Sequence, residues 1–182
     1  MKTPVPDRRL YFFYGCHLNP LQIVRCCTAP VLVGRAALAD YAVAFFGYAT
    51  RWDGAEESLL ATPGATSWGV LYELAGDDAD RLDVAQGVRF DGEGRYFHYL
   101  VEVTTADGKV HEALAYVRNT HGEARLPSRE YLEYIAAGAR DHQLPADYVA
   151  RLLDLPSQPA SYPVPRKRTL RDLVSTESAC CC

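Results

Sequence analysis

The sequence predicts an α+β fold in which a small barrel or a strongly bent mixed sheet is accompanied by helices. Strand-like segments dominate the centre of the chain, helical patterns occupy its early part and its last third, and the two kinds do not alternate as in βαβ units. A length of 182 residues with 48% apolar residues suits one compact domain. We expect that domain over residues 8–155 and an extended C-terminal arm or tail over residues 156–182.

The first predicted element is a buried strand that ends in glycine. Residues 10–14 read LYFFY, and Gly15 follows them directly. Asn19 is a good helix cap and Pro20 suits the first helical position, so we expect a helix from there to about Cys27. The predicted order is therefore strand, turn, helix.

The central part is predicted to be mostly β structure. The strand-like segments are residues 31–38, 42–46, 58–61, 68–74, 96–104 and 110–118. Turn residues such as Thr62-Pro63-Gly64 separate the earlier segments, and Asp107-Gly108 favours a hairpin between the last two. Residues 77–85 are acidic at their start, as the helix dipole favours, and predict a helix between the strands.

Two further helices are predicted in the last third. Ser128 can cap the first, which carries apolar residues at helical spacing, and the second follows Leu144-Pro145. Beyond Leu155 the sequence SQPASYPVPRKR is polar and interrupted by proline, which indicates an arm rather than core.

Charge and apolar patterning exclude several classes of partner. The formal net charge is -4 and no basic stripe alternates with aromatic residues, which argues against nucleic acid as a partner. No apolar run approaches the roughly 18 residues that a membrane helix needs, and the polar, proline-broken start is not a signal peptide. We expect a cytoplasmic protein without stable membrane insertion.

The cysteines predict neither a disulfide framework nor a metal site. Cys16, Cys26 and Cys27 lie early, and the other three, Cys180, Cys181 and Cys182, end the chain. This spacing lacks the pairs that hold structural zinc, and the terminal group is either a lipidation site or an oxidation-prone tail.

Residues 11–18, YFFYGCHL, resemble the signature Tyr-Gly-Ser-Asn-Leu of the γ-glutamylcyclotransferase-like, or AIG2-like, family. Tyr14, Gly15 and Leu18 match the signature, whereas Cys16 and His17 depart from it. The segments TPGATSWGVLYEL and RLDVAQGV, and the two C-terminal helices, continue the resemblance over roughly residues 8 to 155. The resemblance implies a small mixed β-barrel flanked by helices and no metal or organic cofactor.

The resemblance also implies a reaction on a small-molecule γ-glutamyl amine, amide or peptide. In this family the substrate's own α-amine attacks its γ-carbonyl, which releases an amine and 5-oxoproline. The turn from Tyr14 to Leu18 would present backbone N–H groups to a carboxylate or an oxyanion. Tyr96 and Tyr116 correspond to aromatic residues that line the substrate pocket, while Arg51 and Arg95 could meet a substrate carboxylate.

The segment RLDVAQGV resembles the family's Leu-Asp-x-x-Glu-Gly, which implies that Gln86 occupies the position of the catalytic glutamate. An amide keeps hydrogen-bonding capacity but does not titrate near neutrality, so it cannot carry the proton. Three accounts follow: cyclotransfer with another carrier, another acyl-transfer or amide chemistry with Cys16 as nucleophile, or a binding protein that performs no chemistry. His17, Asp83 and Glu93 are the candidate carriers. The assembly state is not set by the sequence, and a homodimer is one alternative.

Overall fold

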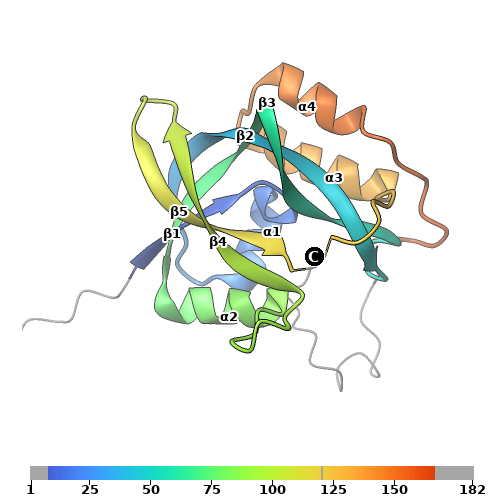
Figure 1. Cartoon of the computed structure of the whole chain (residues 1–182), viewed down its shortest axis with the longest axis horizontal. Coiled ribbons are helices and arrows are strands. Elements are labelled where there is room, and N and C mark those ends of the chain that lie inside the picture. Colours follow the sequence, from blue (N-terminus) through green and yellow to red (C-terminus); the bar gives the residue numbers. More distant parts are fainter. Residues whose placement is uncertain (1–7, 120, 167–182) are drawn as a thin grey trace, which may run out of the picture.

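A computed structural model describes residues 8–119 and 121–166 of the chain. Its described strands close into a barrel in the order β1-β3-β2-β4-β5 (Figure 1). These strands are β1 (Arg8–Phe13), β2 (Val31–Ala49), β3 (Gly54–Ala75), β4 (Tyr96–Thr105) and β5 (Val110–Arg118). The β1–β5 pairing is parallel and the other pairings are antiparallel, so the predicted mixed barrel is confirmed.

Strands β2 and β3 are each longer than the sequence predicts. Each joins two predicted segments into one strand, and the ladder between them continues through register shifts. At one shift Ala39 pairs with Thr66 and Tyr41 with Ala61, so the chain around Thr62-Pro63-Gly64 bulges out of the ladder. The turn residues therefore mark a bulge rather than the end of a strand.

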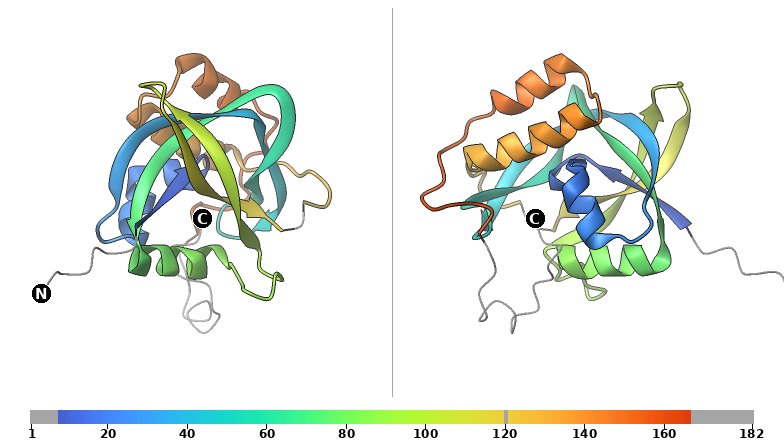
Figure 2. Two further views of the ribbon diagram at one scale, coloured as in Figure 1. Left: turned by 60° about the vertical axis from the view of Figure 1, so that its left-hand side comes forward. Right: turned by 180° about the vertical axis from the view of Figure 1, so that it is seen from behind.

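The helices lie close to their predicted positions. They are α1 (Pro20–Cys26), α2 (Gly76–Gln86), α3 (Arg129–Asp141) and α4 (Ala146–Leu153), with a short 3₁₀ turn η1 (Cys16–Leu18) before α1. Asn19 and Ser128 accept backbone N–H bonds as the predicted caps of α1 and α3. Figure 2 shows that α2 and the α3–α4 pair lie on opposite sides of the barrel.

The main core lies between the barrel and these helices. Tyr131, Leu132 and Ile135 of α3 are at most 1% exposed and pack with residues of β1, η1 and α2. This packing fixes the end of β1 and the end of α2 relative to each other, which positions the pocket described below.

The described part of the C-terminal arm is attached to the domain. Asp53 accepts hydrogen bonds from the backbone N–H of Ser161 at 2.5 Å and from its hydroxyl at 2.6 Å. The backbone N–H of Ala160 donates to Glu130 at 3.0 Å. The arm thus lies against the domain as far as residue 166, while Cys180–Cys182 fall outside the described residues. Over the described ranges, no helix has the length and apolar character to span a membrane.

Candidate active site

The turn after β1 has the predicted strand-turn-helix geometry. The Leu18 N–H donates to the Gly15 carbonyl at 2.9 Å and closes the short turn η1. Gly15 has φ -117°, so glycine is not required here for a positive φ. Its requirement is space, because a Cβ at Gly15 would lie 2.0 Å from the Glu57 Oε1 atom.

Most of the predicted site residues line one small pocket beside this turn. Its lining comprises Phe12, Phe13, Tyr14, Gly15, His17, Glu57, Gln86, Tyr96 and Tyr116. The side chains of Cys16 and Leu18 are not part of this lining, and Leu18 is fully buried in the main core. The pocket has a volume of about 20 Å³, which is room for about one water molecule.

Gln86 and His17 contact each other at one side of the pocket. The Gln86 Nε2 atom lies 3.3 Å from His17 Nδ1, and the Cys16 sulfur also lies 3.3 Å from that nitrogen. Burial lowers the pKa of His17 to about 3, because a buried imidazole loses the solvation of its charged form. His17 is therefore neutral at physiological pH and is a weaker base than an ordinary histidine.

The other residues proposed for chemistry either lack a free thiol or lie outside the pocket lining. Cys16 is disulfide-bonded, so its sulfur is not a thiol nucleophile in this structure. Asp83 is not in the pocket lining, and its carboxylate accepts hydrogen bonds from the Tyr116 hydroxyl at 2.5 Å and from His98 Nε2 at 2.7 Å. Glu93 is exposed on the loop before β4 and lies outside the lining.

Three tyrosine hydroxyls surround the pocket as neutral donors. Tyr14 donates to the Tyr116 carbonyl, and Tyr96 donates to the Glu57 carbonyl at 2.8 Å. Burial raises the pKa of Tyr14, Tyr96 and Tyr116 well above the usual range, with nearby carboxylates adding to the effect. These hydroxyls keep their protons at neutral pH and can donate to a ligand or to the protein.

Glu57 is a pocket residue that the sequence analysis missed. Its Oε1 atom accepts the Cys16 backbone N–H at 2.9 Å, and its Oε2 atom accepts the hydroxyl of Tyr131. Glu57 is 7% exposed, and its side chain fills the space beside Gly15. It therefore accepts a hydrogen bond from a turn N–H that the resemblance assigns to a substrate carboxylate or oxyanion.

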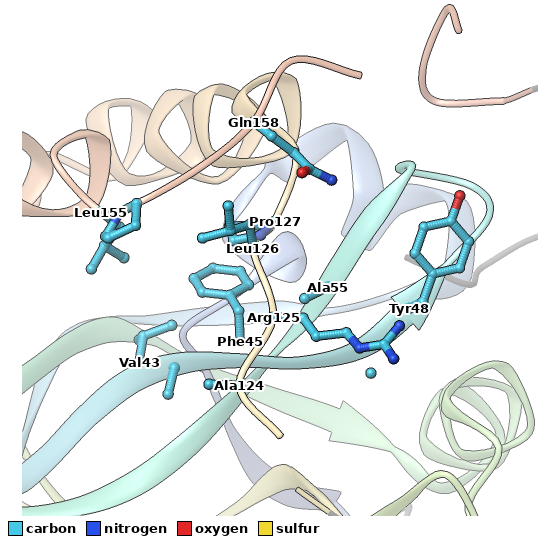
Figure 3. Close-up of a pocket in the computed structure, with 13 residues that line it drawn as sticks. Val43, Phe45, Tyr48, Ala55, Ala124, Arg125, Leu126, Pro127, Leu155 and Gln158 are labelled. Carbon is cyan, nitrogen blue, oxygen red and sulfur yellow. The ribbon is translucent and has the colours of Figure 1, made fainter. Parts of the chain in front are cut away.

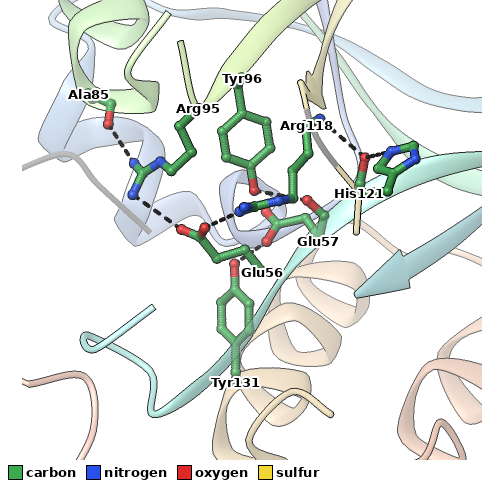
Figure 4. Close-up of polar contacts among 9 residues, drawn as sticks. Glu56, Glu57, Ala85, Arg95, Tyr96, Arg118, His121 and Tyr131 are labelled. Carbon is green, nitrogen blue, oxygen red and sulfur yellow. Dashed lines mark hydrogen bonds and ion pairs between the residues drawn. The ribbon is translucent and has the colours of Figure 1, made fainter. Parts of the chain in front are cut away.

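The neighbouring Glu56 is also buried but has different partners. Figure 4 shows its carboxylate between the guanidinium groups of Arg95 and Arg118. Arg95 Nη1 lies 3.3 Å from Glu56 Oε1, and Arg118 Nη1 bonds Oε2. Burial raises the pKa of Glu56, and the two arginines oppose that shift. Arg95, which the sequence suggested for a substrate carboxylate, thus binds a carboxylate of the protein.

A larger cavity lies elsewhere on the molecule, between β2 and the segments that flank α3 and α4. It has a volume of about 650 Å³ and a largely apolar lining that includes Phe45, Tyr48, Arg125 and Leu155 (Figure 3). None of the predicted site residues lines it. Within the described ranges, no group of three or more His, Cys, Asp or Glu residues is arranged to hold a metal ion.

Comparisons with known proteins agree with the fold. The AIG2-like family model matches residues 66–152. The γ-glutamylcyclotransferase of Mus musculus is 29% identical over 154 residues, which covers 79% of this chain and 76% of the relative. The Bos taurus γ-glutamylcyclotransferase is 27% identical over 174 residues, covering 93% of this chain and 89% of the relative.

A solved structure described as a γ-glutamyl cyclotransferase has the same architecture. It superposes with a TM-score of 0.80 at 27% sequence identity, covering 87% of this chain and 94% of that chain. The family model covers the last part of β3, α2, β4, β5, α3 and nearly all of α4. The chain is thus similar to γ-glutamylcyclotransferases in both sequence and fold.

Proposed function

We propose that this protein is a γ-glutamylcyclotransferase-type enzyme that acts on a γ-glutamyl amine, amide or peptide. The observation that carries the proposal is the convergence of the β1 turn, Gln86 and the hydroxyl-bearing Tyr96 and Tyr116 on one buried pocket. The names of its relatives support the same activity. Products are the free amine and 5-oxoproline.

The chemistry suits a pocket that offers backbone N–H groups, tyrosine hydroxyls and one carboxylate. Attack of the α-amine on the γ-carbonyl of the same molecule needs no second reactant, and effective molarities in well-oriented cases reach ~10⁵ M or more. The protein must bend the substrate, stabilise the oxyanion and move protons. The Cys16 N–H and the tyrosine hydroxyls are donors of the kind that stabilise an oxyanion.

Substrate binding requires the pocket to widen. A volume of about 20 Å³ is too small for a γ-glutamyl group, and Glu57 fills the space against the turn. Displacement of the Glu57 side chain would free the Cys16 N–H and enlarge the pocket at the same time.

The closed pocket and the amide at Gln86 favour one second candidate, a protein that binds γ-glutamyl compounds without converting them. Both candidates share the ligand class. γ-Glutamyl peptides of glutathione metabolism are the first compounds to test, and we expect the protein to act in the cytoplasm on small molecules rather than on nucleic acid.

The test is incubation of the full chain with a panel of γ-glutamyl amines, amides and peptides. Mass spectrometry measures 5-oxoproline and the released amine, and isothermal titration calorimetry measures binding. Equal amounts of both products support cyclotransfer. Binding without either product supports the second candidate, and no binding by any compound contradicts both.

A further inference from the structure

The pocket contains few groups that can exchange a proton near neutral pH. The titratable side chains in its lining are His17, Glu57 and three tyrosines. His17 has a pKa of about 3, and burial raises the tyrosine pKa values well above the usual range. Glu57 is the one carboxylate in the lining, which comprises only described residues.

Glu57 also lacks the cationic partner that a buried carboxylate normally has. Within residues 8–119 and 121–166, no arginine, lysine or histidine forms an ion pair with it, and its two oxygens are held by neutral donors, the Cys16 N–H and the Tyr131 hydroxyl. A buried charge without a partner is costly. The α-ammonium group of a γ-glutamyl substrate would supply the missing positive charge.

The position of Tyr131 keeps this carboxylate directed at the turn. Tyr131 is fully buried in the first turn of α3, and Trp52 stacks on its ring at a centroid distance of 4.6 Å. Burial and the Glu57 charge raise the pKa of Tyr131 well above the usual range, so its hydroxyl remains a donor. Tyr131 is thus a positioning residue, whereas Glu57 lines the space into which the substrate must enter.

We propose that Glu57 is the catalytic carboxylate that exchanges protons with the substrate, the role that Gln86 cannot perform. This inference rests on the proposed cyclotransferase function and adds to it the residue that carries the proton. In the empty pocket the carboxylate is bound to the Cys16 N–H; in the complex it turns to the ammonium group, and the N–H becomes available to the oxyanion.

The proton balance of this step closes within the pocket. Glu57 takes one proton from the α-ammonium group, and the resulting amine attacks the γ-carbonyl carbon, forming the ring C–N bond. Protonated Glu57 then gives that proton to the leaving nitrogen as the original amide C–N bond breaks. Glu57 next removes the second proton from the ring nitrogen and passes it to the released amine. The products are then 5-oxoproline and the protonated amine, and Glu57 is again a carboxylate.

The test compares Glu57→Gln with wild type on the γ-glutamyl compound that wild type converts fastest. We expect kcat to fall by ~10²–10⁴-fold, the usual contribution of a positioned acid–base group. Glu93→Gln, which removes an exposed carboxylate outside the lining, is the matched control and should retain the wild-type rate. Glu57→Asp keeps a carboxylate and should recover part of the lost rate.

One further measurement separates chemistry from a damaged pocket. The affinity for 5-oxoproline, which carries no ammonium group, should be unchanged in Glu57→Gln when it is measured by calorimetry.

The outcomes distinguish this inference from the function on which it rests. If wild type forms no 5-oxoproline from any compound, the proposed function is wrong and this inference is wrong with it. If wild type is active and Glu57→Gln is equally active or faster, only the inference is wrong, and Glu57 merely obstructs the pocket. Loss of 5-oxoproline binding together with activity would also contradict it, since that pattern indicates a structural role.

Discussion

Glu56 and Glu57 are adjacent on β3 and both buried, yet they have different kinds of partner. Glu56 is bound by two guanidinium groups, from the residue just before β4 and from the end of β5, so its charge is neutralised within the protein. Glu57 faces the pocket and is held by a backbone N–H and a phenol. Of the two buried carboxylates, only Glu57 has both access to the pocket and a charge left for a ligand.

The difference shows how burial alone fails to identify a functional acid. Removing one partner from a buried ion pair typically costs stability, whereas Glu57 forms no ion pair within the described residues and is held by two neutral donors. We therefore assign Glu56 to stability and Glu57 to chemistry.

The largest expected difference between the two carboxylates is in stability, and Glu56→Gln should show it. The change leaves Arg95 and Arg118 without their shared anion, so the free energy of unfolding should fall by about 3 kcal/mol. Urea denaturation measures that loss, and the corresponding Glu57→Gln loss should be about 1 kcal/mol or less. Equal losses for the two variants would remove the distinction between the two carboxylates.

Gly15→Ala tests the contact that seats Glu57 against the turn. The new Cβ would lie 2.0 Å from Glu57 Oε1, so the flexible carboxylate must leave the Cys16 N–H while the turn itself is kept. We expect the rate of 5-oxoproline formation to fall by ~10²-fold if the displaced carboxylate no longer reaches the substrate. In a Glu57→Gln background, Gly15→Ala should lower the rate little further, because the effects of substitutions at residues in contact are not additive.

A smaller effect is expected from His17, whose lowered pKa links stability to pH. The unfolded chain binds the proton below a pKa near 6.5, whereas the folded chain binds it only near 3, so stability is lost as pH falls between these values. The loss is about 1.4 kcal/mol per pH unit, or about 2 kcal/mol at pH 5.

The variant His17→Asn should lack this dependence. Urea denaturation of wild type and variant at pH 7.5 and at pH 5 isolates the effect, since a loss of packing appears at both pH values and cancels in the difference. Wild type should lose about 2 kcal/mol more than the variant on acidification. Equal losses would mean that His17 is not buried as a neutral imidazole.

Local sequence signals predicted the helices and the positions of the strand segments along the chain. Asn19-Pro20 and Ser128 satisfy the first N–H groups of a helix, a requirement that depends on nearby residues only. The continuity of β3 could not be predicted, because Thr62-Pro63-Gly64 carries the same signal whether it ends a strand or forms a bulge. The exposure of Leu21 and Val24 on α1, which are 64% and 63% accessible, was also not foreseen.

The candidate site could be predicted only as far as the family signature extends. Tyr14, Gly15, His17 and Gln86 were identified and lie together, but their roles depend on contacts made across the barrel. Glu57 was missed because two successive glutamates in a strand usually indicate a solvated edge. No local signal in the sequence separates the two acids, since Arg95 and Arg118, which bind Glu56, follow many residues later.

The central claim is that the catalytic carboxylate is that of Glu57 and that Gln86 does not carry the proton. The most direct measurement exchanges the side chains at positions 57 and 86. Single-turnover rates of 5-oxoproline formation are compared for wild type, Glu57→Gln, Gln86→Glu and the double variant. The account predicts a small change for Gln86→Glu alone, a loss of ~10²–10⁴-fold for Glu57→Gln, and substantial recovery in the double variant, where the pocket again holds one carboxylate. A large gain for Gln86→Glu, with no loss for Glu57→Gln, would contradict it and show that the wild-type pocket lacks a proton carrier.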